Sequence, residues 1–139
     1  MVSGLSHITL IVKDLTRTGK LFKELFHAEE IYSSGNATFS LSREKFFLIG
    51  GLWFCIMEGE PLPTQTYNHI ALQIPAEAFE GCAKLIRELG LEIEPGRPRV
   101  SGEGRSLYFY DYDNHLFELH TGNLTDRLAR YAQGGTCSK

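Results

Sequence analysis

The chain has 139 residues, a formal net charge of −3, 42% hydrophobic residues and 22% charged residues. This length is enough for one compact domain that buries roughly two thirds of the surface of its unfolded chain, and the composition is that of an ordinary globular protein. The acidic balance excludes the basic face typical of nucleic-acid or anionic membrane binding, and the absence of an 18-residue apolar run or a signal peptide predicts a cytoplasmic protein.

The first half of the chain alternates between strand-like and helical patterns. Residues 5–12 form a β-branched and aliphatic run that predicts a strand with His7 and Thr9 on one face. Asp14 can cap a helix that ends near Phe26. Three further strand-like segments follow at residues 29–34, 37–42 and 46–59, and the sequence Arg43-Glu44-Lys45 between the last two predicts a solvated turn.

The second half repeats this order. The proline-containing segment 59–66 predicts an irregular connection, and the sequence Asn-His-Ile-Ala around His69 then repeats the His-Ile-Thr-Leu around His7. A helix is predicted over residues 76–89, where Gly90 ends it. Strands are predicted at residues 91–95, 106–112 and 115–121. A last helix is predicted at 123–131, with Asn123 as its cap and with apolar residues at Leu124, Leu128 and Tyr131.

The repetition predicts an α+β fold of two βαβββ modules, over residues of about 1–60 and 66–122, within a single domain spanning 1–139. The helix of each module covers one sheet face, so the pairing of two modules would close the other faces around a shared cavity.

One carboxylate, Glu118, lies between the apolar residues Phe117 and Leu119 in the last predicted strand, where its desolvation is costly without a positive partner. By alternation Glu118, His7 and His69 all point toward the cavity, and two imidazoles with one carboxylate suit Mn, Fe(II), Zn or Ni. Each histidine alone could be structural. His120 shares the face of Glu118 and could be a fourth ligand or a donor to a ligand, but the sequence favours a packed core histidine. His115 is expected to bond backbone in its turn.

These motifs, together with Phe-Glu-Leu-His at 117–120, resemble the vicinal oxygen chelate superfamily of glyoxalase-like folds. Over nearly the whole chain the sequence is similar to the fosfomycin resistance proteins, in particular the FosX type that hydrolyses the antibiotic. The resemblance implies Mn(II) held by His7, His69 and Glu118 in a homodimer whose paired modules come from different subunits. It also implies that Glu44 is the general base, a role that its predicted position in a turn would not suggest.

Fosfomycin is a small phosphonate that carries an epoxide, so its site also needs cations and hydroxyl donors. The resemblance assigns Arg127 as the phosphonate cation and Trp53 as a pocket wall. Arg99 is a further candidate cation. The expected hydrogen-bonding neighbours are Thr9, Tyr67, Ser106 and Tyr108.

Thiol-transferring relatives carry a Ser-x-x-x-Ser loop, whereas the corresponding segment here begins with Gly102 and ends with Ser106. This difference favours water as the nucleophile. The alternatives are a transferase that adds glutathione or another thiol to fosfomycin, and a non-catalytic protein that sequesters the drug. A ring-cleaving dioxygenase would use the same ligand set with Fe(II).

Overall fold

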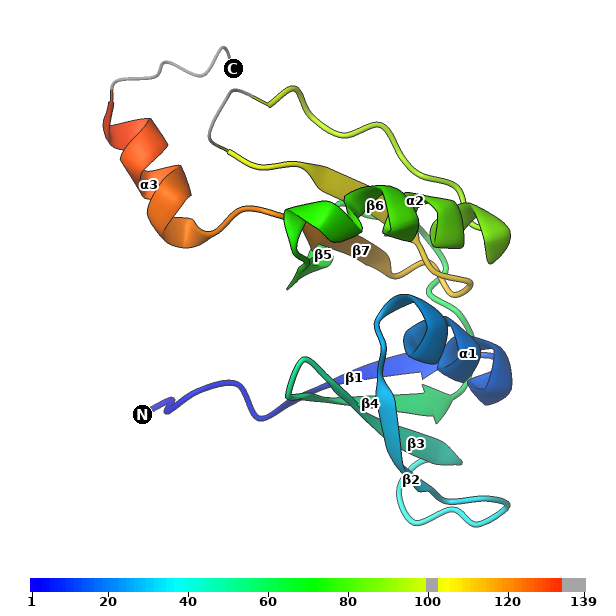
Figure 1. Ribbon diagram of the computed structural model, residues 1–139. Coiled ribbons are helices and arrows are strands. Elements are labelled where there is room, and N and C mark those ends of the chain that lie inside the picture. Colours follow the sequence, from blue (N-terminus) through cyan, green and yellow to red (C-terminus); the bar gives the residue numbers. More distant parts are fainter. Residues whose placement is uncertain (100–102, 134–139) are drawn as a thin grey trace. The chain divides into compact units, whose positions relative to one another are not determined.

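The computed structural model describes residues 1–99 and 103–133, which divide into two units. The first unit comprises Met1–Gln65 with Asp111–His115, and the second comprises Thr66–Tyr110 with the residues from Leu116 onward. In the first unit, the described residues form one four-stranded sheet in the order β1-β4-β3-β2 with one helix, α1 (Figure 1). The elements are β1 (His7–Val12), α1 (Leu15–Leu25), β2 (Glu29–Ser33), β3 (Glu44–Ile49) and β4 (Leu52–Glu58).

Helix α1 begins where the sequence predicted, because the Asp14 side chain accepts a hydrogen bond from the Arg17 backbone N–H at 3.0 Å. Its buried stripe packs against the sheet, and the Phe22 ring meets Phe47 and Phe54 edge-on at centroid distances of 5.4 and 6.1 Å. Since Phe47 and Phe54 are paired across β3 and β4, the helix covers a single sheet face. The opposite face carries His7, Thr9, Trp53 and Glu44.

The prediction of strands at 37–42 and 46–59 was wrong in detail. Residues 37–42 form no strand, with bends at 39–42, and the apolar run splits into β3 and β4. Gly50 and Gly51 have φ of 55° and 80°, the left-handed values that a tight two-residue hairpin turn requires. The number of strands after the helix is as predicted, but the hairpin takes in Glu44 and Lys45, which were expected in a turn.

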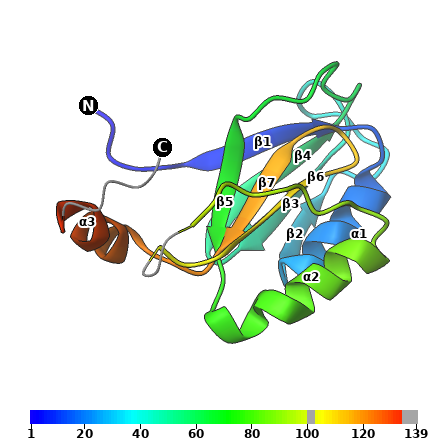
Figure 2. The same ribbon diagram turned by 90° about the horizontal axis from the view of Figure 1, so that it is seen from above.

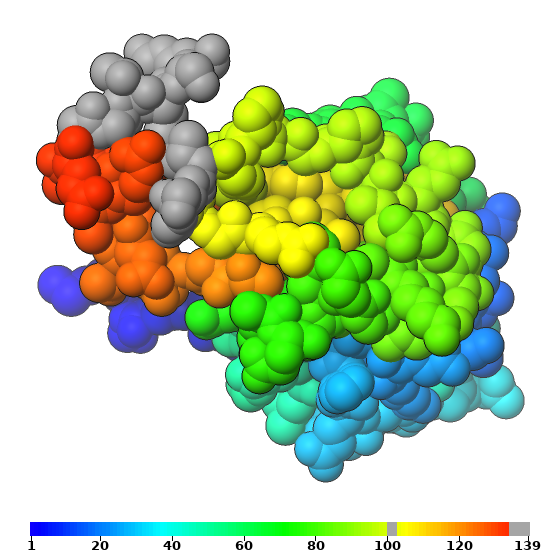
Figure 3. All heavy atoms as spheres, turned by 45° about the horizontal axis from the view of Figure 1, so that its top comes forward, coloured from blue at the N-terminus to red at the C-terminus, as the bar shows by residue number. Residues whose placement is uncertain are grey.

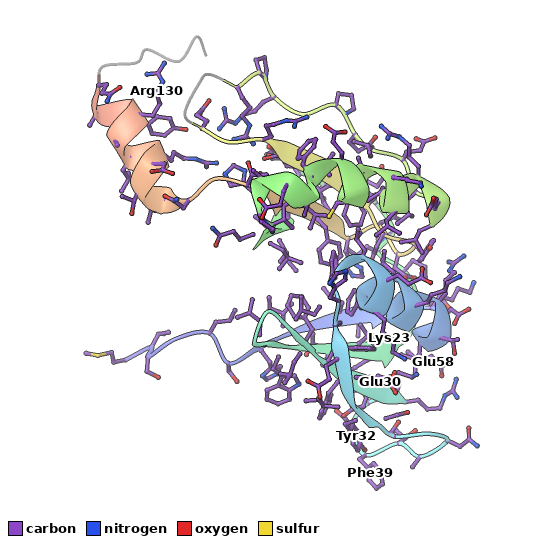
Figure 4. The ribbon with its side chains drawn as sticks, in the orientation of Figure 1. Lys23, Glu30, Tyr32, Phe39, Glu58 and Arg130 are labelled. Atoms are coloured by element: carbon purple, nitrogen blue, oxygen red, sulfur yellow. The ribbon has the colours of Figure 1, made fainter. Side chains whose placement is uncertain are left out.

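Strands β2 and β3 are also joined by charge. Glu30 contacts the ammonium groups of Lys23 at 3.0 Å and Lys45 at 3.2 Å, and Figure 4 shows Lys23 and Glu30 on neighbouring elements. Burial raises the pKa of Glu30, but its hydrogen bonds to the two lysines outweigh that effect and leave the pKa below its ordinary value. Phe39, on the loop before β3, is by contrast 78% exposed.

In the second unit, the described residues form a three-stranded sheet in the order β5-β7-β6, covered on one face by α2 (Figure 2). The elements are β5 (His69–Gln73), a 3₁₀ turn η1 (Ala76–Ala78), α2 (Phe79–Glu88), β6 (Ser106–Tyr110), β7 (Leu116–His120) and α3 (Leu124–Ala132). The strand predicted at 91–95 is reduced to a single bridge between Glu94 and Tyr108. As predicted, Gly90 follows α2, with φ of 78°.

The core of the second unit lies between α2 and the apolar face of the sheet. Phe109 and Phe117 stack there at a centroid distance of 5.7 Å. Asn123 caps α3 by accepting from the Asp126 N–H at 2.8 Å, as predicted, but no residue of α3 is buried. Over residues 1–99 and 103–133, no helix is long and apolar enough to cross a membrane.

The turn between β6 and β7 is built by two buried aspartates. Asp111 accepts from the backbone N–H groups of Asp113 and His115, and Asp113 accepts from the Lys13 N–H at 2.9 Å. The His115 Nδ1 lies 2.8 Å from an Asp111 carboxylate oxygen, so His115 bonds a side chain in this turn and not backbone as expected.

Candidate active site

The polar face of the second sheet gathers the predicted ligands and donors of this unit. Register pairs Glu118 in the central strand β7 with Tyr108 of β6 and Ala71 of β5, and pairs His120 with Ser106. Because side chains alternate, these residues share a face with His69, while Phe117 and Leu119 point to the core. Glu118 is 5% exposed, as expected for a carboxylate between apolar neighbours.

Glu118 and His69 face one another through two electron-rich atoms. The His69 Nδ1 lies 2.7 Å from the Tyr67 carbonyl oxygen, so it must donate its proton there, and Nε2 points at Glu118 Oε1 at 3.0 Å. A lone pair and a carboxylate oxygen at this distance need a proton or a cation between them. Two ligands that lie about 2.0–2.2 Å from one ion are about 3 Å apart at right angles, so the pair fits a metal.

The second oxygen of Glu118 is held by donors. Ser106 Oγ donates to Oε2 at 2.6 Å, and the Arg99 Nη2 lies 3.3 Å from the same oxygen. Burial raises the pKa of Glu118, but hydrogen bonds from Ser106 and Tyr108 and the neighbouring positive charges together lower it below its ordinary value. The carboxylate is therefore ionised at neutral pH and suited to bind a metal.

Arg99 brings a cation to the same face. Its Nη2 donates to Ser106 Oγ at 3.0 Å and to the Tyr108 hydroxyl at 2.9 Å. Its Nη1 is buried and has no hydrogen-bond partner among the residues that the structure describes, which leaves the N–H groups of this nitrogen for a ligand. The Tyr67 hydroxyl lies 3.4 Å from that of Tyr108, and burial with this contact raises the pKa of Tyr108.

His120 links this cluster to α3. Its Nδ1 lies 2.7 Å from Ser106 Oγ, and its Nε2 lies 3.3 Å from the Arg127 Nη2. Burial lowers the pKa of His120, whereas the negative charge of Glu118 raises it. The positive charges of Arg127, Arg99 and Arg97 lower it further, and the net shift is downward. His120 is thus hydrogen-bonded at both ring nitrogens and is more than the packed core histidine that the sequence favoured.

A second charged group lies next to this cluster. Glu103 is 2% exposed and contacts Arg97 at 3.1 Å and the Tyr131 hydroxyl of α3 at 3.3 Å. Figure 3 shows the yellow segment that follows Glu103 against the orange segment after β7, where the Thr121 N–H donates to the Arg105 carbonyl at 3.0 Å. Gly102, the position that differs from the thiol-transferring relatives, lies outside the described residues.

The first unit carries the other predicted residues on the open face of its own sheet. Register places Trp53 beside His7 and Cys55 beside Thr9, and the His7 and Trp53 rings lie 4.2 Å apart. The His7 Nδ1 is 2.9 Å from the Ser6 hydroxyl, which leaves Nε2 for a metal. The Trp53 Nε1 is buried without a hydrogen-bond partner in the described part of the chain.

Glu44 is the residue whose predicted environment was wrong. It is the first residue of β3, is 8% exposed and lies opposite Met57 in the hairpin. The charges that flank Glu44 are both paired: Arg43 bonds Glu58, and Lys45, whose side chain is 20% exposed, bonds Glu30. The Gly50-Gly51 pair was the signal that could have placed Glu44 in a strand, because a hairpin turn there extends the pairing back to residue 44.

Glu44 also affects Cys55 on the neighbouring strand. Burial and, to a smaller extent, the negative charge of Glu44 raise the pKa of the Cys55 thiol, and a hydrogen bond with Thr9 opposes them; the net result is a pKa of about 11. Cys55 is therefore an uncharged thiol at neutral pH, and the Glu44 carboxylate lies close enough to influence it.

The structure thus brings together seven predicted residues in the second unit and four in the first. The first group is Tyr67, His69, Arg99, Ser106, Tyr108, Glu118 and Arg127, and the second is His7, Thr9, Glu44 and Trp53. Within residues 1–99 and 103–133 of one chain, no group of three or more His, Cys, Asp or Glu side chains is arranged to hold a metal.

Comparison with known proteins agrees with this fold. Residues 4–119 match the Glyoxalase/Bleomycin resistance protein/Dioxygenase superfamily. The fosfomycin resistance proteins FosX of Listeria monocytogenes and Listeria innocua are 66% and 68% identical to the chain, and each match covers 94% of this chain and 98% of the relative.

A crystal structure of a mutant of the Listeria monocytogenes FosX, complexed with Mn(II) and 1S,2S-dihydroxypropylphosphonic acid, matches with a TM-score of 0.86 and 61% identity. The match covers 94% of this chain and 99% of that one. The chain belongs to the Glyoxalase/Bleomycin resistance protein/Dioxygenase superfamily and, within it, to the FosX family of fosfomycin resistance proteins.

Proposed function

We propose that this protein is a Mn(II)-dependent enzyme that opens the epoxide of fosfomycin with water to give the vicinal diol. The observation that carries the proposal is the likeness to the Listeria monocytogenes FosX, whose crystal structure contains Mn(II) and a dihydroxypropylphosphonic acid, the diol that such a reaction yields. We further propose that the enzyme acts in the cytoplasm as a homodimer in which each site combines residues of both protomers.

The proposed metal ligands are His7, His69 and Glu118, with His7 supplied by the other protomer. The facing lone pairs of His69 and Glu118 support this assignment, since a cation between them relieves their repulsion. When bound, Mn(II) would act as a Lewis acid toward the epoxide oxygen.

The phosphonate would be held by Arg99 and Arg127, with hydroxyl donors around them. The buried Nη1 of Arg99 supports this role, because a phosphonate oxygen would satisfy a donor that is otherwise unpaired among the described residues. Tyr67, Ser106 and Tyr108 line the same face, and Thr9 and Trp53 would approach from the first unit of the partner.

Glu44 would remove the proton from the attacking water. A carboxylate in this position is expected to contribute about 10² to 10⁴ in rate as a general base. The low exposure of Glu44 and its place on the open sheet face with His7 and Thr9 support this role over that of a surface charge.

The test is to incubate the purified protein with Mn(II) and fosfomycin without thiol and to follow the reaction by phosphorus NMR. Diol formation is expected, and its appearance only after glutathione, cysteine or bacillithiol is added would instead identify a thiol transferase. If fosfomycin binds but stays intact under all conditions, the protein sequesters the drug.

Two variants test the roles of Glu44 and the metal ligands. Glu44→Gln should retain Mn(II) binding and lose at least 100-fold in hydrolysis, whereas Glu29→Gln, an exposed strand glutamate, should retain full activity. Unchanged turnover in Glu44→Gln would remove Glu44 from the mechanism. His69→Ala should lose tight Mn(II) binding.

A further inference from the structure

The polar contacts around Ser106 determine where its hydroxyl proton points. Three groups lie within hydrogen-bond distance of Ser106 Oγ: the Arg99 Nη2 at 3.0 Å, Glu118 Oε2 at 2.6 Å and the His120 Nδ1 at 2.7 Å. A hydroxyl has one proton and two acceptor lone pairs, so three partners fill it completely. Arg99 can only donate and the ionised Glu118 can only accept. Ser106 therefore gives its proton to Glu118 and must accept from His120.

This requirement sets the tautomer of His120. Its Nδ1 must carry a proton to donate to Ser106. At the other side of the ring, Arg127 offers only donors, so the Nε2 at 3.3 Å from its Nη2 must be the unprotonated acceptor. A proton on Nε2 would place two donors against each other. The partners thus select the neutral Nδ1–H form from among the three forms of the ring.

Backbone packing holds the ring in this place. A Cβ at Gly122 would lie 2.7 Å from the His120 Nε2 and 2.7 Å from the Glu103 carbonyl oxygen, so only glycine lets the ring and the Glu103 segment both approach. The side chain of His120 is 13% exposed. Its orientation is therefore set by neighbours on both edges.

We propose that His120 is a positioning residue that, as the Nδ1–H tautomer, turns the Ser106 hydroxyl toward Glu118 and anchors Arg127. One imidazole then aligns the carboxylate proposed to hold the metal and the cation proposed to hold the phosphonate. The effect of His120 on catalysis rests on the proposed function, whereas its tautomer and hydrogen bonds do not depend on that function. Contacts of this kind behind a metal ligand are commonly worth 10- to 100-fold in affinity or activity.

Two substitutions separate the two contacts of the ring. In His120→Asn the amide branches from the same carbon as Nδ1 and can donate to Ser106, but it is too short to reach Arg127. In His120→Gln the amide oxygen can reach the Nε2 position and accept from Arg127, but no donor remains near Ser106. A matched control is Gln73→Ala, because Gln73 is exposed and lies beside His120 in the β5 and β7 register.

Binding is measured first, as dissociation constants for Mn(II) alone and for the dihydroxypropylphosphonic acid with Mn(II) saturating. We expect His120→Gln to weaken Mn(II) about tenfold or more with little change for the phosphonate, and His120→Asn to show the reverse. Gln73→Ala should match the wild type in both. An equal loss of both affinities in both variants, or no loss in either, would overturn the proposal.

The tautomer is read directly in the metal-free wild-type protein from long-range proton–nitrogen NMR correlations of the His120 ring, assigned by their loss in His120→Asn. The expected pattern is a protonated Nδ1 with a pyridine-like Nε2 at neutral pH, and an Nε2–H or doubly protonated ring would refute it. This readout needs no turnover. A wild type that fails to hydrolyse fosfomycin yet shows the expected tautomer and binding split would refute the proposed function and leave His120 as assigned.

Discussion

Replacing Gly122 by alanine should destabilise the protein, because a Cβ there meets atoms that cannot easily move. Two of its three nearest atoms belong to the Glu103 backbone, with the carbonyl oxygen at 2.7 Å, and the third is the His120 Nε2. The carbonyl oxygen and the His120 Nε2, each at 2.7 Å, must retreat by about 0.7 Å to reach an ordinary contact. Overpacking of this kind costs about 1–3 kcal/mol. With an unfolding entropy of about 2.1 cal/mol/K per residue, a chain of 139 residues should lose about 3–10 °C in Tm.

The assay is a thermal melt at equal protomer concentration, because the stability of an oligomer depends on concentration. Gly81→Ala is the matched control: Gly81 lies within α2, and nothing lies within 4 Å of its added Cβ. That variant should gain about 0.5–1 kcal/mol, or about 2–3 °C. An unchanged or higher Tm for Gly122→Ala would refute the argument that this loop and the His120 ring are held against each other.

Three further predictions concern charge and chemistry. Glu44→Gln should lower the pKa of Cys55, so Cys55 should alkylate faster at pH 9, as followed by peptide mass spectrometry; an unchanged rate would mean that the two side chains do not interact. Because the folded pKa of Glu30 lies below its ordinary value of 4.5, its charge stabilises the fold above that pH and this contribution is lost as the pH falls through the folded pKa. Glu30→Gln should therefore flatten the acid side of the stability curve measured by urea titration, and an unchanged pH dependence would contradict the pairing. Arg99→Lys keeps one cation but removes the buried Nη1 donor, so KM for fosfomycin should rise about 10- to 100-fold, whereas an unaltered KM would exclude Arg99 from phosphonate binding.

The local sequence predicts that α3 forms a helix, but it does not predict where the helix packs. Asn123 as cap and the apolar spacing of Leu124, Leu128 and Tyr131 predicted the helix correctly, since capping and helical periodicity are local properties. The same three apolar side chains are 69%, 56% and 45% exposed, so the pattern did not indicate burial within the chain. Figure 4 shows Arg130 on the same helix. Helix α3 contacts the site through Arg127, which lies near His120, and through Tyr131, which contacts Glu103.

The sequence by itself determined the α+β repeat, the caps of α1 and α3, and the strand faces on which His69 and Glu118 lie, because alternation in strands and hydrogen bonding at helix ends act over a few residues. Only the tertiary structure decided that Glu44 is buried at the start of a strand and that His120 is bonded at both ring nitrogens. These properties depend on which strands pair and in what register. Pairing partners lie far apart in the chain, so apart from the Gly50-Gly51 turn, which points to a hairpin through Glu44, no local pattern reports these properties.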